Sequence, residues 1–167
     1  MENNISSKTI VDEFIERDDD DPVSLWYKYD MGNEKQYSMC IKHIQKLVRG
    51  SMSYDQWQKR SKWGVQKCPI CEIEKDYVKM ESHHYPATLY DVVDNYLQYL
   101  IDTDELKNKT DFDVCQEIMD QHFLRKVDYI VLCEYCHKKY HDDIPEILDV
   151  IDEKYKEQKK ERESYFK

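Results

Sequence analysis

The sequence has few residues that interrupt regular structure and no long apolar run. It contains only three glycines and four prolines among 167 residues, and 36% of its residues are charged. This composition favours a chain rich in helices. No apolar stretch approaches the ~20 residues needed to cross a bilayer, and no segment resembles a secretion signal. We therefore expect a soluble, cytoplasmic protein with no membrane partner.

Charge is unevenly distributed along the chain, whose net value is −10. The start is acidic and includes the run Asp18–Asp21, whereas residues 34–66 are basic. A negative total disfavours tight nonspecific binding to DNA, but a local basic face can still contact phosphates. The residues expected to do so are Lys42, Lys46, Arg49, Lys59, Arg60 and Lys62. The alternative is an ordinary solvated face, with Trp57 and Trp63 in the core.

Four segments follow from periodicity and from helix-ending residues. Residues 1–33 form an acidic arm, which is either disordered or a docking peptide anchored by Phe14/Ile15 or by residues 25–27. Residues 34–66 form a basic helical segment. Residues 67–145 form a metal-binding core in which β-type runs at 76–84 and 127–132 flank a helical insertion, residues 87–126. Residues 146–167 form a charged C-terminal helix.

Cysteines provide the most specific signal. Four of the six form two C-x2-C pairs, Cys68/Cys71 and Cys133/Cys136. Two such pairs are typical of a closed, structural zinc site with four thiolate ligands. The alternative is redox use of either pair. Cys40 and Cys115 stand alone and are expected as small buried apolar residues.

Histidines lie beside both cysteine pairs. Because four thiolates already satisfy one zinc ion, His83, His137 and His141 are surplus ligands that could hold a second divalent metal with open coordination positions. His137 and His141 are four residues apart and share one helical face. His84 is the candidate general base. The alternative is that these imidazoles support the zinc site or lie at the surface. His43 and His122 are not expected as ligands.

The order C-x2-C, His-His, then Leu-Cys-x2-Cys-His-x3-His resembles the HNH endonucleases over residues 68–141. The resemblance implies an α+β, mostly helical chain: a small ββα-metal, treble-clef-like zinc core with added helices. It implies that His83, His137 and His141 hold the catalytic metal (Mg2+, Mn2+, Ni2+ or Zn2+), that His84 is the base and that the four cysteines hold structural zinc. The implied reaction is hydrolysis of DNA phosphodiester bonds.

Two departures from that family keep a second function open. Asp128, the second catalytic candidate, stands where the family has an asparagine; it could accept a hydrogen bond or bind metal, but it cannot donate a hydrogen bond as an amide does. The insertion, residues 87–126, replaces a short connection. The first hypothesis is a phage-encoded HNH-type endonuclease with DNA as its partner, acting in the host cytoplasm. The second is an inactive zinc scaffold that regulates transcription or host defence and binds a protein through the acidic arm or the insertion.

Overall fold

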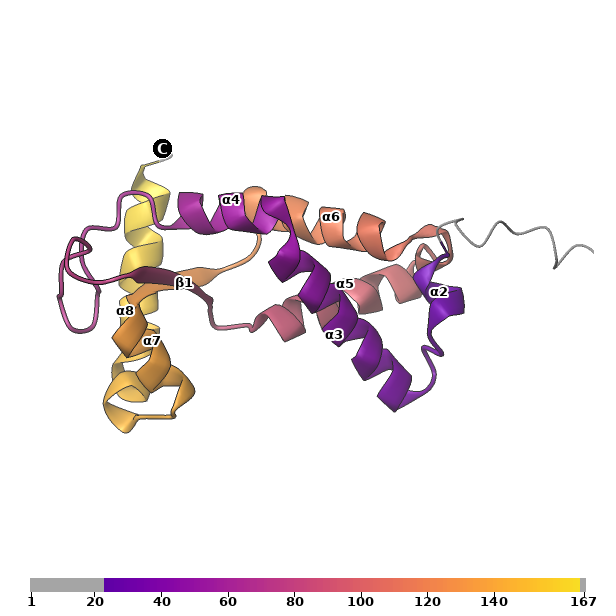
Figure 1. The fold of residues 1–167 in the computed structure, drawn as a ribbon, viewed down its shortest axis with the longest axis horizontal. Helices are drawn as coiled ribbons and strands as arrows, with labels where there is room; N and C mark the ends of the chain where they lie inside the picture. Colours follow the sequence, from indigo (N-terminus) through magenta and orange to yellow (C-terminus); the bar gives the residue numbers. More distant parts are fainter. Residues whose placement is uncertain (1–22, 166–167) are drawn as a thin grey trace, which may run out of the picture.

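The described residues, 23–165 of a computed structural model, form helices around one two-stranded sheet (Figure 1). This confirms a mostly helical α+β chain. None of the described helices is both long and apolar enough to cross a membrane. In chain order the elements are α2 (Leu25–Lys28), α3 (Glu34–Gly50), α4 (Met52–Ser61), β1 (Met80–His84), α5 (Leu89–Asp102), η1 (Leu106–Asn108), α6 (Asp111–Phe123), β2 (Tyr129–Cys133), α7 (Glu134–His141) and α8 (Pro145–Ser164).

Polar side chains define where the helices begin. The Ser51 side chain accepts a hydrogen bond from the backbone of Tyr54 at the start of α4. Thr88 and Thr110 form capping boxes with the aspartates three residues later, at the starts of α5 and α6. Pro145 begins α8, where the missing N–H of proline costs nothing. These short-range signals fix where α4, α5, α6 and α8 begin.

Strands β1 and β2 are antiparallel, with Met80 opposite Cys133 and His84 opposite Tyr129. Met80, Ser82 and His84 are buried on one face of β1, whereas Glu81 and His83 lie half-buried on the other. Helix α7 follows β2 directly and packs on both strands. The order β1, β2, α7 therefore brings residues 80–84 beside residues 133–141.

Two hydrophobic clusters make up the core. One joins α2, α3, α4, α5, η1 and α6, and the other joins the sheet, α7 and α8. The insertion predicted at residues 87–126 therefore supplies α5 and α6 to a helical core shared with α3 (Figure 1). Cys40 and Cys115 are buried in that core, as expected.

The N-terminal segment expected as an arm, residues 1–33, is only partly described. Leu25 is completely buried, and its N–H donates to the Lys109 carbonyl over 2.9 Å. Helix α2, which lies within the segment expected as an arm, thus belongs to the helical core. Phe14, Ile15 and Asp18–Asp21 lie outside the described residues. The two tryptophans of the basic segment differ: Trp57 is 3% exposed, and Trp63 is 79% exposed.

Candidate metal centres

Four cysteines from two distant segments converge at one end of the sheet. Cys68 and Cys71 lie in the turn before β1, Cys133 ends β2 and Cys136 lies in the first turn of α7. Their four sulfur atoms all lie within 4.8 Å of one another, and all four are free thiols. Burial raises the pKa of the Cys133 and Cys136 thiols, so a bound cation would hold these two in the thiolate form. This donor set fits a metal such as zinc.

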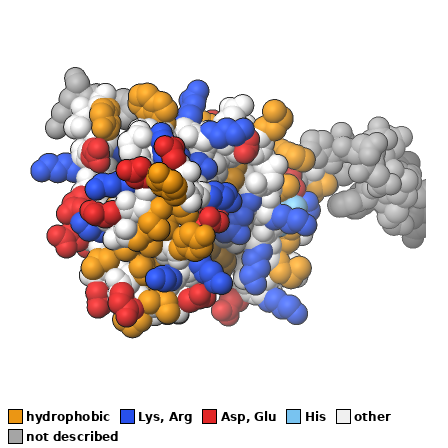
Figure 2. Space-filling view, turned by 60° about the vertical axis from the view of Figure 1, so that its left-hand side comes forward, with side chains coloured by type: hydrophobic (Ala, Val, Ile, Leu, Met, Phe, Trp, Pro, Cys, Tyr) orange, Lys and Arg blue, Asp and Glu red, His pale blue; other side chains and the backbone are white. Residues whose placement is uncertain are grey.

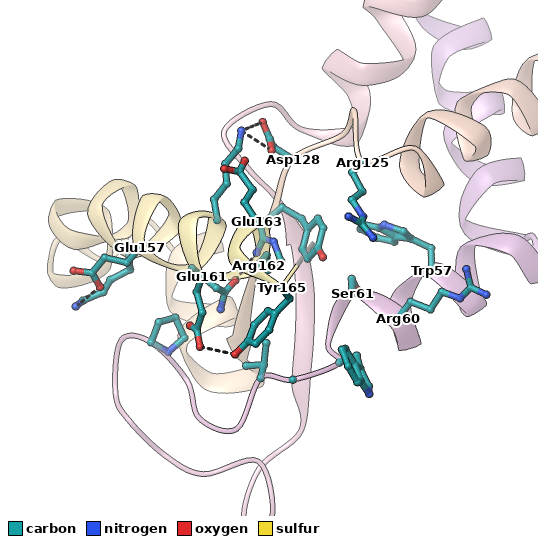
Figure 3. Close-up of a pocket in the computed structure, with 18 of the residues that line it drawn as sticks. Trp57, Arg60, Ser61, Arg125, Asp128, Glu157, Glu161, Arg162, Glu163 and Tyr165 are labelled. Atoms are coloured by element: carbon teal, nitrogen blue, oxygen red, sulfur yellow. Dashed lines mark hydrogen bonds and ion pairs between the residues drawn. The ribbon is translucent and has the colours of Figure 1, made fainter. Parts of the chain in front are cut away.

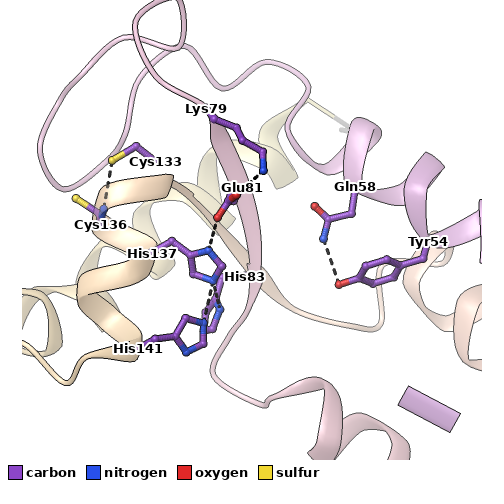
Figure 4. Close-up of polar contacts among 9 residues, drawn as sticks. All are labelled: Tyr54, Gln58, Lys79, Glu81, His83, Cys133, Cys136, His137 and His141. Atoms are coloured by element: carbon purple, nitrogen blue, oxygen red, sulfur yellow. Dashed lines mark hydrogen bonds and ion pairs between the residues drawn. The ribbon is translucent and has the colours of Figure 1, made fainter. Parts of the chain in front are cut away.

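Three histidines form a second group between α7 and the face of β1 that carries Glu81 and His83 (Figure 4). His83 Nδ1 lies 2.9 Å from His137 Nε2, and His141 Nε2 lies 3.0 Å from the same nitrogen. All three offer a ring nitrogen within 4.8 Å of the others. Helix α7 places His137 and His141 one turn apart, and β1 directs His83 toward them. The structure thus brings together the three residues assigned to a second metal.

Glu81 orients this group. Its carboxylate lies 2.6 Å from His137 Nδ1 and accepts a hydrogen bond from Lys79 Nζ over 2.7 Å (Figure 4). Nδ1 of His137 then donates, which leaves Nε2 free to bind a metal. The bond from His137, followed by the one from Lys79, holds the pKa of Glu81 below its usual value. Sequence reasoning missed Glu81. Its position two residues before His83, on the same strand face, was the available signal.

The protonation state of His83 suits metal binding. Burial, and secondarily the neighbouring His137 and His141, lower the pKa of His83 to about 4. The imidazole is therefore neutral at pH 7, the form in which histidine binds metals.

His84 points to the opposite side of β1, so the structure does not bring it to the three-histidine group. It is 8% exposed, and its Nε2 lies 2.9 Å from Nε2 of His122. Its ring stacks on Trp57, with ring centroids 5.1 Å apart. Burial, followed by His122, lowers the pKa of His84 to about 3. The residue assigned as general base is therefore a neutral, enclosed side chain between the sheet and α4.

Asp128 also lies away from the three histidines. It precedes β2 and pairs with Lys159 of α8 over 2.9 Å. Its backbone carbonyl accepts a hydrogen bond from Tyr85, the residue after β1, over 3.3 Å. Asp128 thus joins the end of β1 to the start of β2 through its backbone, and its carboxylate faces α8.

The six basic residues assigned to phosphate contacts are divided between two helices. Lys42, Lys46 and Arg49 are exposed on α3, Lys59 and Arg60 are exposed on α4, and Lys62 caps α4. Lys59 pairs with Asp55, and the Arg60 guanidinium lies over the Phe123 ring. His43 also belongs to the basic segment, and its Nε2 lies 2.9 Å from a carboxylate oxygen of Asp111.

Comparison with known protein families gives a match over nearly the whole chain. Neither a curated protein nor a solved structure matches the chain. A family model described as "Bacteriophage G278-like virion protein" matches residues 2–165, and no match to an HNH family accompanies it. Nearly the whole chain is covered, which supports the phage origin expected from the sequence. The chain therefore belongs to the Bacteriophage G278-like virion protein family.

Proposed function

We propose that this virion protein is a metal-dependent phosphodiesterase acting on DNA, built on an HNH-like ββα unit with a structural zinc site. The observation that carries the proposal is the convergence of His83, His137 and His141 on one point. Among the described residues, the group has three imidazoles and no fourth protein ligand, which is typical of catalytic rather than structural metal sites.

The residues around this point have distinct roles. His83, His137 and His141 would bind the ion, and Glu81 would fix the His137 tautomer. A divalent ion held there would polarise a phosphodiester oxygen and lower the pKa of a bound water molecule. The four cysteines would hold β1 and α7 at a fixed separation, because they connect the segment before β1 to the first turn of α7.

The finer fold assignment belongs to the same proposal. The order β1, β2, α7, with the histidines on β1 and α7 and the four cysteines together at one end of the sheet, supports a ββα-metal, treble-clef-like core. The helical cluster would then be an addition to that core.

One observation favours a second candidate, a metal-stabilised scaffold without catalysis. The imidazole of His84, the expected base, is buried against Trp57 and His122. In this conformation His84 therefore cannot take a proton from a water molecule at the three-histidine group. A scaffold of this kind would use both metal sites to hold a surface for another virion component.

Cleavage of supercoiled plasmid separates the two candidates. Purified, zinc-loaded protein is incubated with Mg2+, Mn2+, Ni2+ or Zn2+ in turn. The hydrolase proposal expects metal-dependent nicking that falls to background in His137→Ala. A His43→Ala variant, altered at a histidine outside both metal groups, is the matched control and keeps its activity.

Two outcomes carry further meaning. No cleavage of plasmid or of phage genomic DNA with any metal, from folded protein, would overturn the hydrolase proposal and favour the scaffold. If cleavage occurs, His84→Gln tests the base. Loss of activity with unchanged metal affinity would mean that His84 leaves its buried site during the reaction.

A further inference from the structure

A groove lies away from the three histidines, between α8 and α4 (Figure 3). Its volume is about 820 Å³. Ser61, one of its lining residues, contacts Ser82 on the face of β1 opposite His83. Neither metal-binding histidines nor metal-binding cysteines line it. The groove is therefore a separate candidate binding site, and its role does not depend on the proposed reaction.

The lining combines aromatic rings with both signs of charge. In the lining, Trp57 is buried and Tyr129 is half-buried, whereas Trp63 is 79% exposed and Tyr165, just after α8, is 61% exposed. Six Lys/Arg and five Asp/Glu line the groove, whereas the whole chain has 25 basic and 35 acidic residues. The groove is thus locally more basic than the molecule. Figure 2 shows hydrophobic side chains gathered on the end of the molecule that comes forward, with both charges around them.

The lysines and arginines of the lining differ in their partners. Lys67 pairs with Glu72, Lys154 with Glu157, and Lys159 with Asp128. By contrast, the Arg60 guanidinium lies over the Phe123 ring, and Arg162 donates to Gln158 and to the Tyr129 carbonyl. Neither arginine has a carboxylate partner among the ion pairs of the described residues. Guanidinium groups in this state favour a carboxylate-rich ligand.

Residues 1–22 of the chain itself have the complementary chemistry. They contain eight acidic residues against Lys8 and Arg17. Ile10, Val11, Phe14 and Ile15 are spaced so that they fall on one face of a helix. An acidic segment with one apolar face matches a groove with aromatic walls and available arginines.

Chain length allows either copy to supply this segment. Lys28 of α2 pairs with Asp111 at the start of α6, and α6 runs about 18 Å to Phe123, which lines the groove. Val23 lies nine residues after Phe14, and this stretch spans about 30 Å when extended. A neighbouring copy can equally present its α2 end to the groove, and only that arrangement links copies.

We propose that residues 2–22 of one copy bind in the α4–α8 groove of a second copy. Phe14 and Ile15 would pack on the exposed rings of Trp63 and Tyr165, and the acidic residues would pair with Arg60 and Arg162. The contact joins two different surfaces, so it is heterologous, and repetition gives a ring or a filament. Such repeated self-assembly suits a component of a virion.

Complementation between two full-length variants tests the proposal. The groove variant carries Trp63→Ala and Arg60→Glu, and the arm variant carries Phe14→Ala and Ile15→Ala. Molar mass is measured by light scattering, without nucleic acid, over a range of concentrations. Wild type should exceed the monomer mass increasingly with concentration, and less so in high salt. Each variant alone should remain a monomer, and an equimolar mixture should give a dimer that grows no further.

The matched control carries Tyr77→Ala and Lys42→Glu, two exposed residues that do not line the groove, and should assemble like the wild type. Circular dichroism verifies that every variant is folded. A wild type that stays monomeric, or a mixture of variants that forms no dimer, would overturn the proposal. Assembly of the arm variant alone would overturn it as well.

Discussion

Glu81 provides a test at the scale of one residue, because it contacts a metal-binding histidine and need not touch the metal itself. Its carboxylate holds Nδ1 of His137 at 2.6 Å. Glu81→Gln keeps the size but removes the charge that fixes this tautomer. We expect a 10–100-fold weaker affinity of the three-histidine group for Ni2+ or Co2+, measured by isothermal titration calorimetry (about 1.4–2.7 kcal/mol).

Matched variants distinguish orientation from general loss of structure. Glu81→Asp should recover part of the affinity, because it restores the negative charge. Glu74→Gln, an exposed carboxylate outside the group, should leave affinity unchanged. Zinc content at the four cysteines should be the same in all three. Equal affinity in Glu81→Gln and wild type would remove the orienting role.

Residue types and spacing predicted which histidines come together, but not which way each one faces. His137 and His141 are fixed by the helical period, so their shared face could be predicted. For His83 and His84, alternation along the strand requires opposite faces without saying what covers each face. That answer comes from Trp57 and His122, which reach His84 from α4 and α6. Contacts between distant elements leave no mark in the local pattern.

At the scale of elements, Trp57 connects α4 to the rest of the molecule. It lies in the helical cluster, stacks on His84 and meets the Tyr129 ring edge-on at 5.3 Å. We expect Trp57→Ala to lower the free energy of unfolding by about 3–5 kcal/mol, because it leaves a large cavity. Denaturant unfolding followed by circular dichroism gives the value. Trp63→Ala, at a residue 79% exposed, should change it by no more than about 0.5 kcal/mol.

The N-caps of α5 and α6 give a second test among the elements. Thr88 accepts from the Asp91 backbone at 3.2 Å, while the Asp91 carboxylate accepts from the Thr88 backbone at 2.7 Å. Thr88→Ala should cost about 1 kcal/mol of unfolding free energy, and Thr88→Ser should cost much less. Thermal denaturation measures both. If alanine and serine were equally tolerated, the cap would not contribute to stability.

Helix positions were predictable from the same caps, whereas the partners of the helices were not. Thr88, Thr110 and Pro145 mark starts that can be read locally. The apolar spacing of residues 89–101 gives a buried face but does not identify α3 as the helix it packs on. The partners of the insertion could therefore not be predicted from the sequence, and in the structure it is half of a second core.

For the whole molecule, zinc and the two hydrophobic clusters predict stepwise loss of structure. The four cysteines tie the segment before β1 to α7, within the cluster that includes α8. After a chelator removes zinc, this half should unfold at a lower temperature than the helical cluster, because the four cysteines would no longer be held together. Zinc content by mass spectrometry and amide hydrogen exchange by residue provide the measurement. Simultaneous loss of protection in α3, α5 and α6 would show that the two clusters unfold as one.

Acid should destabilise the molecule through the buried His84–His122 pair. Burial lowers the pKa of both imidazoles, and that of His84 falls from 6.5 to about 3. Above pH 6.5 both folded and unfolded chains hold these histidines neutral, so their contribution is constant. Below 6.5 the unfolded chain takes up protons that the folded chain refuses, and stability falls until the pH reaches about 3.

The expected slope identifies the cause. One such histidine lowers the free energy of unfolding by about 1.4 kcal/mol per pH unit between pH 6 and 4, and a second buried histidine adds to this. His84→Gln removes one titrating group but keeps a donor for His122 Nε2, so its slope should be shallower by about that amount. His43→Gln, at a half-buried histidine far from the pair in the chain, should follow the wild type. Urea unfolding at pH 7, 6, 5 and 4 compares the three proteins, each stripped of metal, so that the other histidines, including His83 with its lowered pKa, contribute equally to all three slopes. Parallel curves for wild type and His84→Gln would mean that the acid response arises elsewhere.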